Sequence, residues 1–252
     1  MGVSIVISNQ KGGVGKTMFA VHLAEYAVEK GRRVLVVDVD GQGNTSRYFT
    51  GHLAEHGKGT SQLYAGGETP KPLAVREALW ILPADKALND VEALPLEVVM
   101  HPRRHLAALA KDYDVIVIDT PPSQGRRLLG ALVAASAVVT PLALDRASFE
   151  GLEDLLSDLK HVRTKLNPQL RHLGILVNRF RRPNKRQRES LVELREQLGD
   201  RVLPGEIEDR SPVGAAFDAR HPIWKKTTGE SARIAAHEFR AACATVLERA
   251  AA

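Results

Sequence analysis

The sequence has little cysteine, few aromatic residues and no long apolar run. Its one cysteine, Cys243, excludes an internal disulfide and a cysteine-rich metal or cluster site, and it fits a reducing compartment. The longest apolar runs, such as VIVID and ALVAASAVV, are far shorter than the roughly 18 residues of a membrane-spanning helix. No charged-then-apolar leader opens the chain. We therefore expect a soluble, cytoplasmic protein in which Cys243 packs within a helix.

The length of the chain indicates the number of domains, and its net charge indicates the kind of partner that it can bind. At 252 residues, of which 44% are hydrophobic, the chain is long enough for one sizeable core, and we expect one α/β domain over residues 1–252. The formal net charge of +5 and the isoelectric point near 9.4 are modest, but they permit an anionic partner. Where the positive charge concentrates therefore matters more than its total.

Short apolar runs alternate with helical patterns along the chain. Near-continuous apolar runs are typical of buried parallel strands. The predicted strands are residues 3–8, 32–40, 113–122, 136–144 and 170–180, with a shorter one at 202–207. The predicted helices are residues 17–31, 151–166, 185–198 and 229–250. This alternation predicts an α/β fold with a doubly wound, mostly parallel sheet flanked by helices, and residues 47–80 are expected to form a loop-rich insertion.

Three of the predicted strand ends carry residues that bind phosphate or magnesium. In open α/β sheets, ligands lie beyond the carboxyl ends of the strands, so we expect these ends to converge on one site. The residues are Lys16 and Thr17 after the first strand, Asp38 and Asp40 on the second, and Asp119 on the third.

The segment GGVGKT, residues 12–17, has the composition of a phosphate-binding loop. Its glycines let backbone N–H groups curl around phosphate oxygens at the start of a helix. Lys16 offsets phosphate charge, the Thr17 hydroxyl can ligate Mg²⁺, and Asp119 can hold the same ion through water. A plain strand-to-helix turn is the alternative, which the Lys-Thr pair and the acidic strand ends disfavour. The predicted nucleotide-binding residues are Lys11, Gly12, Gly13, Val14, Gly15, Lys16, Thr17 and Met18.

Lys11 marks a departure from the general phosphate-loop pattern, which has glycine where this sequence has Gln10. The segment KGGVGKT is the deviant Walker A box, and here the chain resembles the ParA/MinD family of P-loop ATPases. In that family the early lysine reaches across a dimer interface to the partner's nucleotide, so the resemblance implies a catalytic role for Lys11 beside Lys16. Such a lysine adds positive charge where a phosphoryl group is transferred. The alternative is a solvated loop lysine.

The segment VVDVDGQGNTS, residues 36–46, resembles the D-x-D-P-Q-G-N segment of ParA-type partition ATPases, with Gly41 in place of proline. The resemblance implies that Asp40 orients or activates the attacking water, that Asp38 supports the magnesium shell, and that residues 42–44 belong to a nucleotide-sensitive switch. An aspartate at a strand end can instead cap the next element, an alternative that applies more to Asp38. The glycine bears on the rigidity of the switch rather than on the chemistry.

Three further segments extend the resemblance along nearly the whole chain: DTPPS, NRF and HPIWKKT. The last resembles the G-x-P-V-W region of plasmid partition ATPases, most closely the short form of broad-host-range plasmids. The resemblance implies that Asn178 reads adenine, since an amide both donates and accepts; a capping asparagine is the alternative. Because the phosphate loop begins within ten residues of Met1, we expect no preceding helix-turn-helix region and no operator-specific autoregulation.

The segment RFRRPNKRQRE, residues 179–189, is a dense run of positive charge that we call the basic stretch. Such density without a recognition helix favours contacts to DNA phosphates with no base reading. A solvated charged helix is the alternative, but members of the resembled family bind nonspecific DNA as ATP-bound dimers. The predicted DNA-binding residues are Arg179, Arg181, Arg182, Lys185, Arg186 and Arg188, extended by Lys225 and Lys226.

Two other patterns also have a functional alternative. The C-terminal pattern at 231–251 is amphipathic, which raises the possibility of a membrane-targeting helix of the MinD kind. Its many alanines and the single aromatic Phe239 suit packing on the sheet better, so we expect no stable membrane association. His101 and His105 have a spacing that metals use, but no third ligand accompanies them, and we expect surface histidines.

The resemblance implies a DNA partition ATPase with ATP and Mg²⁺ as cofactors. Such a protein forms a homodimer on Mg-ATP, binds nonspecific DNA on the nucleoid, and hydrolyses ATP to ADP and phosphate when a ParB-like centromere-binding partner stimulates it. One alternative is a MinD-like membrane-associated positioning ATPase. Another is a ParA relative that positions other cargo or aids conjugative transfer. A reductase like the nitrogenase iron protein needs cluster cysteines, which Cys243 alone cannot supply.

Overall fold

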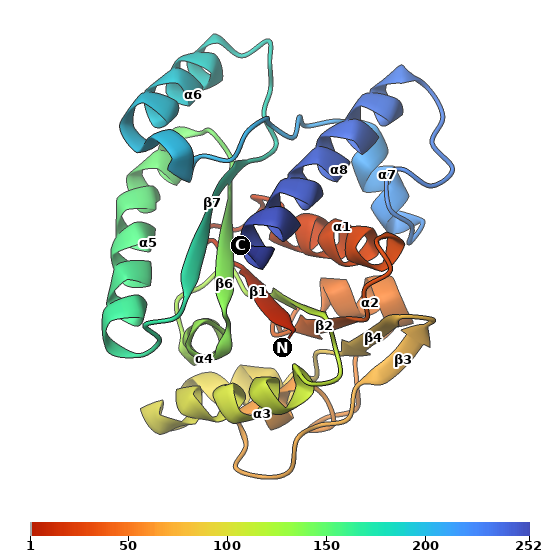
Figure 1. Cartoon of the computed structure of the whole chain (residues 1–252), viewed down its shortest axis with the longest axis vertical. Helices are drawn as coiled ribbons and strands as arrows, with labels where there is room; N and C mark the ends of the chain where they lie inside the picture. The colour runs from red at the N-terminus through yellow and green to blue at the C-terminus, as the bar shows by residue number, and fades with distance from the viewer. Residues whose placement is uncertain (1) are drawn as a thin grey trace.

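In the computed structural model, which describes residues 2–252 without the side chains of residues 146–150, seven strands form one sheet (Figure 1). Their order is β3-β4-β2-β5-β1-β6-β7; β3 pairs antiparallel with β4, and the other neighbours are parallel. The strands are β1 (Val3–Ile7), β2 (Val34–Asp38), β3 (Leu73–Arg76), β4 (Leu79–Leu82), β5 (Val115–Asp119), β6 (Ala137–Leu142) and β7 (Arg171–Val177). The predicted mostly parallel α/β fold is confirmed.

Helices cover both faces of the sheet, with α1 and α8 over one face and α3 and α4 over the other (Figure 1). Side chains alternate between the faces, so Ile5 and Ile7 pack towards α1 and α8 while Val6 packs on the opposite side. The helices are α1 (Lys16–Glu29), α2 (Asn44–Thr50), α3 (His101–Leu109), α4 (Arg126–Ala134), α5 (Arg146–Lys165), α6 (Lys185–Leu198), α7 (Ser211–Asp218) and α8 (Glu230–Ala251). Short 3₁₀ turns are η1 (Thr60–Tyr64), η2 (Lys86–Ala93), η3 (Leu96–Met100) and η4 (Gly199–Arg201).

The strands that carry the predicted site residues are neighbours. β5 lies between β1 and β2, and the register pairs Asp119 with Ile7 on one side and with Asp38 on the other. The three carboxyl ends are therefore level at one edge of the sheet. This places the phosphate loop, which follows Ile7, beside the two acidic strand ends, as the sequence predicted.

The expected loop-rich insertion at 47–80 is wrong at its C-terminal end. Residues 73–82 form the hairpin β3–β4, and β4 extends the sheet by pairing with β2. Its turn contains Ala78 with φ of 59°, where hairpins commonly use glycine or asparagine. Because neither residue marks this turn, the sequence carried no hairpin signal.

The predicted strand at 202–207 is also wrong. Val202 makes an isolated bridge with Ile175, and the chain then turns at Pro204 and Gly205, which has φ of 76°. Leu203 N and Ile207 N still donate to carbonyl oxygens of β7, those of Ile175 and Val177. Because proline lacks the N–H that a strand ladder needs, these separate bonds do not become a continuous strand.

The expectation of surface histidines is wrong for His105, which is fully buried. Its ring lies 3.1 Å from the Thr69 hydroxyl and 3.3 Å from the Ala65 carbonyl oxygen. His101 is half-buried, with Nδ1 at 2.8 Å from the Tyr64 carbonyl oxygen. The cause is the chain at 64–69, which packs on α3, and helical spacing alone cannot show what covers a helix.

The C-terminal helix α8 packs against α1, as expected for a core helix. Phe239 and Cys243 are buried in this layer. His22 of α1 joins them: its Nδ1 lies 2.7 Å from the Met18 carbonyl oxygen, and its Nε2 accepts the Ile223 N–H at 3.1 Å. The HPIWKKT segment is thereby tied to the helix that follows the phosphate loop. In the described part of the chain, no helix is both long and apolar enough to cross a membrane.

Candidate active site

The phosphate loop joins β1 to α1, and two of its glycines have left-handed backbones. Gly13 has φ of 76° and Gly15 has φ of 88°, which residues with a Cβ adopt at a cost. A Cβ on Gly15 would lie 2.2 Å from the amide nitrogen of Asn178, so only glycine fits there. Because α1 begins at Lys16, the loop N–H groups lie at the positive end of a helix. The geometry is that of an anion cradle.

A cavity of about 480 Å³ opens beside this loop. Its volume is in the range of small-molecule sites. The predicted residues that line it are Gly12, Gly13, Gly15, Lys16, Thr17, Met18, Asp40 and Asn178. The switch residues Gln42 and Asn44 also line it, and Val213, Phe217 and Phe239 add an apolar part. The cavity therefore combines a charged end with an apolar end, as a nucleotide requires.

The two lysines of the loop have different surroundings. Lys16 is buried, and its Nζ donates to the Lys11 carbonyl oxygen at 3.0 Å. Burial lowers the pKa of Lys16, while Asp119 and Asp40 oppose this shift. Lys11 pairs through its Nζ with Asp145 and is not among the described residues that line the cavity. The contact of Lys11 with a partner's nucleotide across a dimer stays a prediction.

Asp119 ends β5 beside the phosphate loop and is fully buried. Its Oδ2 accepts hydrogen bonds from the hydroxyls of Thr17 and Thr45, both at 2.7 Å. Its Oδ1 is buried with no hydrogen-bond partner within the described chain. Burial raises the pKa of Asp119 to about 6, against the effect of the two threonine hydrogen bonds. An orphaned carboxylate oxygen beside a threonine hydroxyl fits a magnesium shell, which would satisfy both.

Asp38 makes contacts with the start of α2 that the resemblance did not imply. Its Oδ2 accepts from the N–H and the hydroxyl of Ser46, at 2.8 and 2.6 Å, and its Oδ1 accepts from the Asp40 N–H at 3.1 Å. These contacts cap the first turn of α2, the alternative considered from the sequence. Burial, followed by the nearby Asp119, raises the pKa of Asp38 to about 8. A contribution of Asp38 to the magnesium shell stays a prediction.

Asp40 reaches the cavity from the loop between β2 and α2. Its Oδ1 accepts from the Gln42 N–H at 3.0 Å, and its carbonyl oxygen accepts from the Gly43 N–H at 2.8 Å, so the carboxylate is held in a tight turn. The neighbouring Gly41 has no room for a larger residue as the side chains stand, because a Cβ there would lie 2.4 Å from Asn89 Oδ1.

No group of three or more His, Cys, Asp or Glu that could hold a metal was found in the described part of the chain. This does not conflict with magnesium. Mg²⁺ in phosphate-transfer sites is typically held by one or two carboxylates, waters and the phosphates of the substrate. Thr17 and Asp119 are the residues that would hold it here, and the charge of the ion would stabilise a transferring phosphoryl group.

Comparisons with known proteins agree with this geometry. A protein family described as an AAA domain matches residues 2–172. The chromosome-partitioning ATPase Soj of Thermus thermophilus is 34% identical over 248 residues, which is 97% of this chain and 95% of that protein. This chain belongs to the ParA/Soj family of P-loop ATPases. Protein IncC of Escherichia coli is 33% identical over 244 residues, 94% of this chain and 67% of that protein.

A solved structure shows the same architecture with nucleotide. Cobyrinic acid a,c-diamide synthase from Mycobacterium smegmatis, with bound ADP and magnesium, superimposes with a TM-score of 0.82 at 27% identity. The match covers 98% of this chain and 95% of that one. The resemblance to ParA-type ATPases inferred from the phosphate loop is thus confirmed at the level of family and fold.

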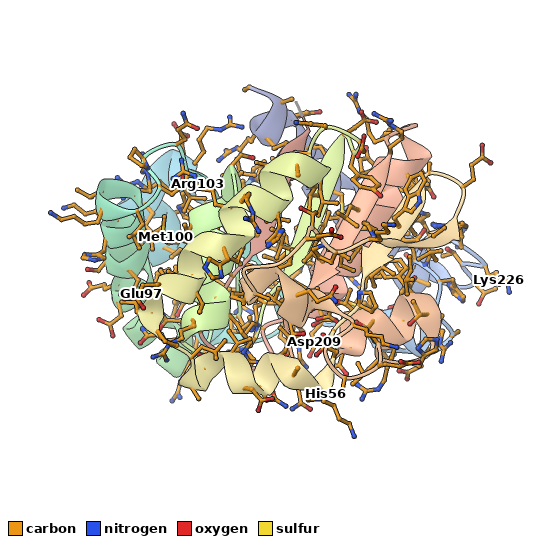
Figure 2. The ribbon with its side chains drawn as sticks, turned by 90° about the horizontal axis from the view of Figure 1, so that it is seen from below. His56, Glu97, Met100, Arg103, Asp209 and Lys226 are labelled. Carbon is orange, nitrogen blue, oxygen red and sulfur yellow. The ribbon has the colours of Figure 1, made fainter. Side chains whose placement is uncertain are left out.

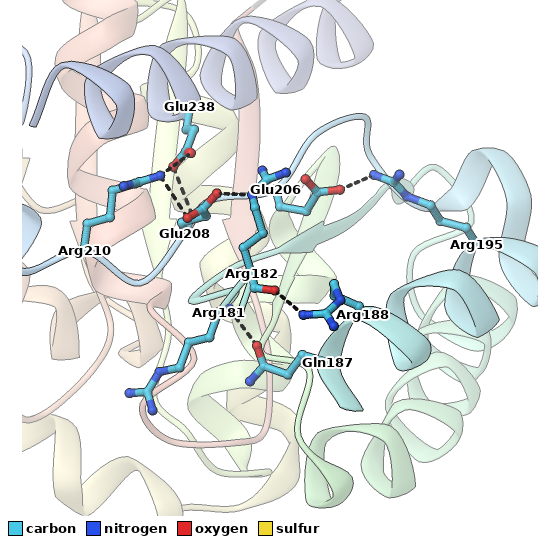
Figure 3. A network of polar contacts seen from close by, with 9 residues as sticks. All are labelled: Arg181, Arg182, Gln187, Arg188, Arg195, Glu206, Glu208, Arg210 and Glu238. Atoms are coloured by element: carbon cyan, nitrogen blue, oxygen red, sulfur yellow. Dashed lines mark hydrogen bonds and ion pairs between the residues drawn. The ribbon is translucent and has the colours of Figure 1, made fainter. Parts of the chain in front are cut away.

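In this member of the ParA/Soj family, three arginines of the basic stretch form ion pairs with Asp209 and Glu208. Arg181 donates to Asp209 Oδ2 at 2.8 and 3.0 Å, and Arg182 donates to Glu208 at 2.7 Å. Figure 3 shows the network continuing from Glu208 to Arg210, which also pairs with Glu238. These arginines are therefore partly neutralised from within the chain.

The other predicted DNA contacts are more scattered. Lys185 lies 3.7 Å from Glu189 on the exposed side of α6, and Arg188 donates to the Arg182 carbonyl oxygen. Lys225 lies 3.8 Å from Glu25. Figure 2 shows Lys226 at one edge of the molecule, well away from Asp209, so Lys225 and Lys226 do not continue the basic stretch directly.

Two site features had no clear sequence signal. Thr45 and Ser46 bind Asp119 and Asp38 from the start of α2, although the D-x-D motif pointed only to the aspartates. Residues 207–210 form a wall of the cavity from far along the chain. Asn178, which was predicted, donates through Nδ2 to the Val14 carbonyl oxygen at 2.8 Å, and its contact with adenine stays a prediction.

Proposed function

We propose that this chain is a DNA partition ATPase that binds Mg-ATP, forms a homodimer around two nucleotides and coats the nucleoid through nonspecific DNA contacts. A ParB-like centromere-binding protein stimulates hydrolysis to ADP and phosphate, which releases the chain from DNA and moves the cargo. The observation that carries the proposal is that the deviant phosphate loop and Asp40 line one cavity while Asp119 accepts a hydrogen bond from Thr17 of that loop, in a chain related to Soj along almost its whole length.

The chemistry of ATP hydrolysis follows from the residues around the cavity. The loop N–H groups and Lys16 hold the phosphates, and Thr17 with Asp119 would hold Mg²⁺. Asp40 lines the cavity on the side of the switch and orients the attacking water. Lys11, which does not line its own cavity, adds positive charge to the nucleotide of the facing subunit. The site is thus completed by dimerisation.

The proposed DNA surface is the start of α6. Lys185 and Arg186 are exposed, and Arg188 is exposed one turn further along the helix. The first turn of α6 contains no acidic residue. Positive charge at a helix N-terminus is unfavourable for the helix itself, which supports a role outside it, such as binding phosphates.

A membrane-associated function of the MinD kind has less support. The apolar face of α8 is occupied by the core, because Phe239, Cys243 and Val246 are buried against α1 and the sheet. An amphipathic helix binds lipid through an apolar face that is available to it. The prediction of no stable membrane association is therefore kept.

DNA co-sedimentation tests the proposal directly. The purified chain is mixed with DNA of unrelated sequences in the presence of ATP and Mg²⁺, of ADP and Mg²⁺, or without nucleotide. We expect binding with ATP alone, of equal strength for each sequence. Equal binding in all three conditions, or none in any, contradicts the proposed cycle. Liposome co-sedimentation in parallel tests the membrane alternative, which requires binding to lipid. A neighbouring gene that encodes a centromere-binding protein would favour DNA as the cargo over other cargo.

A further inference from the structure

Arg179 is the residue of the basic stretch that contacts the phosphate loop. Its Nη1 donates to the Gly13 carbonyl oxygen at 2.9 Å, and its Nε lies 3.4 Å from Asp209 Oδ1. Its side chain lines the cavity and is 49% exposed. Arg181 and Arg182, by contrast, do not line the cavity and pair with the acidic residues beside it.

The backbone at Arg179 is what turns its side chain towards the loop. Consecutive side chains of an extended chain point to opposite sides. Arg179 has φ of 53°, a left-handed conformation that residues with a Cβ rarely adopt. As a result Asn178 and Arg179 contact consecutive carbonyl groups of the loop, those of Val14 and Gly13. Strain of this kind clusters at functional sites, where surrounding contacts maintain it.

Asp209 holds the guanidinium of Arg179 from the neighbouring segment, which also lines the cavity. The backbone of its segment is fixed beside the basic stretch, because Phe180 N donates to the Ile207 carbonyl oxygen at 3.0 Å and Asp209 N donates to the Phe180 carbonyl oxygen at 2.9 Å. Burial raises the pKa of the Asp209 carboxyl, but its contacts with Arg181 and Arg179 outweigh burial and lower it. Arg179 is therefore held between a loop carbonyl and a carboxylate.

We propose that Arg179 contacts the phosphates of bound ATP and that Asp209 positions it, which assigns Arg179 to the nucleotide site rather than to the DNA surface. The inference rests on the proposed function, since it concerns the same nucleotide. Within the described contacts Arg179 uses Nη1 and Nε, which leaves Nη2 to donate to a phosphate oxygen. Gly13, whose carbonyl it holds, belongs to the loop that cradles those phosphates, and arginine forms strong charge-assisted bonds with phosphate.

The test compares Arg179→Gln with Arg181→Gln. Both variants remove one positive charge from a partner of Asp209, but only Arg179 reaches the loop. Competition against a fluorescent ATP analogue measures the Kd for ATP, which we expect to rise about ten-fold for Arg179→Gln and to stay within about two-fold for Arg181→Gln. Arg179→Lys, which keeps the charge but not the fork, should recover part of the loss.

DNA affinity supplies the second readout. With ATP saturating for each protein, Arg179→Gln should keep the wild-type dependence of DNA affinity on salt. A log-log salt slope smaller by about 0.9, with an unchanged Kd for ATP, would show that Arg179 contacts a DNA phosphate and would overturn the proposal. Wild-type protein that binds no ATP would overturn the proposed function instead, together with this inference.

The variant Arg179→Gly separates a loss of ATP affinity from a loss of folding. Glycine adopts a positive φ without the penalty of a Cβ, so this variant should melt at the wild-type temperature or above it. It should nevertheless lose ATP affinity as Arg179→Gln does. Full ATP affinity in a stable Arg179→Gly protein contradicts the proposed phosphate contact.

Discussion

Asp40 and Asp119 are both carboxylates near strand ends, and the different roles that we propose for them rest on their different surroundings. Asp119 is fully buried, receives two threonine hydroxyls and has an orphaned oxygen, which suits a cation. Asp40 is half-buried on the switch side of the cavity, where water can reach it. The proposed roles, magnesium binding for Asp119 and water orientation for Asp40, are therefore distinguished by burial and hydrogen bonding rather than by residue type.

Asp40→Ala should lower ATP turnover by about 100-fold or more, because a positioned general base or water-orienting group contributes on that scale. It should leave ATP affinity nearly unchanged, since the loop and Lys16 are intact. The variant should accumulate as an ATP-bound dimer, which size-exclusion chromatography with ATP detects. A monomer under these conditions contradicts either the role of Asp40 or the dimer.

His22 predicts a dependence of stability on pH. Burial lowers its pKa from 6.5 to about 4, so below pH 6.5 the unfolded chain binds a proton that the folded chain does not. The stability that neutral His22 contributes is complete above pH 6.5 and is lost as the pH falls towards 4. The loss amounts to about 2 kcal/mol between about pH 7.5 and about pH 5.

Urea unfolding at a series of pH values, for wild type and His22→Gln, checks this prediction. The glutamine amide can still donate to Met18 and accept from Ile223, but it does not titrate in this range. The variant should therefore show a shallower fall of unfolding free energy with acid. His172, whose pKa burial also lowers to about 4, affects both proteins alike. Parallel pH profiles would remove His22 as the cause.

At the scale of elements, α6 carries positive side chains at its N-terminus, where the helix dipole disfavours them. Asn184 caps it by accepting the Gln187 N–H at 3.3 Å, but the first turn then carries Lys185 and Arg186 instead of acidic residues. Cations at this end of a helix cost about 0.3–1 kcal/mol each. The DNA phosphates of the function that we propose would offset this cost by binding the positive charge.

Changing Lys185, Arg186 and Arg188 together to Glu should therefore affect DNA binding and stability differently. DNA affinity with ATP should be lost, with a log-log salt slope smaller by about 2.7 if each residue contacts one phosphate. The melting temperature should stay equal or rise, because acidic residues favour the helix N-terminus. ATP affinity should not change, since none of the three lines the cavity. If DNA affinity and its salt slope do not change, the basic stretch is a solvated charged helix and not a DNA-binding surface.

At the scale of the molecule, the function that we propose makes nucleotide binding, dimerisation and DNA binding a sequence of dependent steps. Lys16 is the residue on which all of them depend, because it is buried in the loop that holds the phosphates. Lys16→Ala should abolish ATP binding, and with it the ATP-dependent dimer and DNA binding. Isothermal titration with ATP, followed by chromatography and co-sedimentation, measures each step. Retained ATP affinity would contradict the assignment of the phosphate loop.

The sequence by itself determined the fold class and the chemistry of the phosphate site. Buried parallel strands must be apolar throughout, and a loop that cradles phosphate through its backbone must be rich in glycine, so both leave a local pattern. The segment KGGVGKT and the aspartates at strand ends therefore located the site and the family before any contact was known.

Only the tertiary structure decided which distant residues meet at that site. Asp38 proved to cap α2 through Ser46, His105 proved to be buried, and Arg179 proved to reach the phosphate loop. The hairpin β3–β4 was also not predicted from the sequence, because its turn has Ala78 where glycine or asparagine would have marked a hairpin. Such outcomes depend on contacts between segments far apart in the chain and on backbone angles that packing imposes, and neither leaves a periodic signal in the sequence.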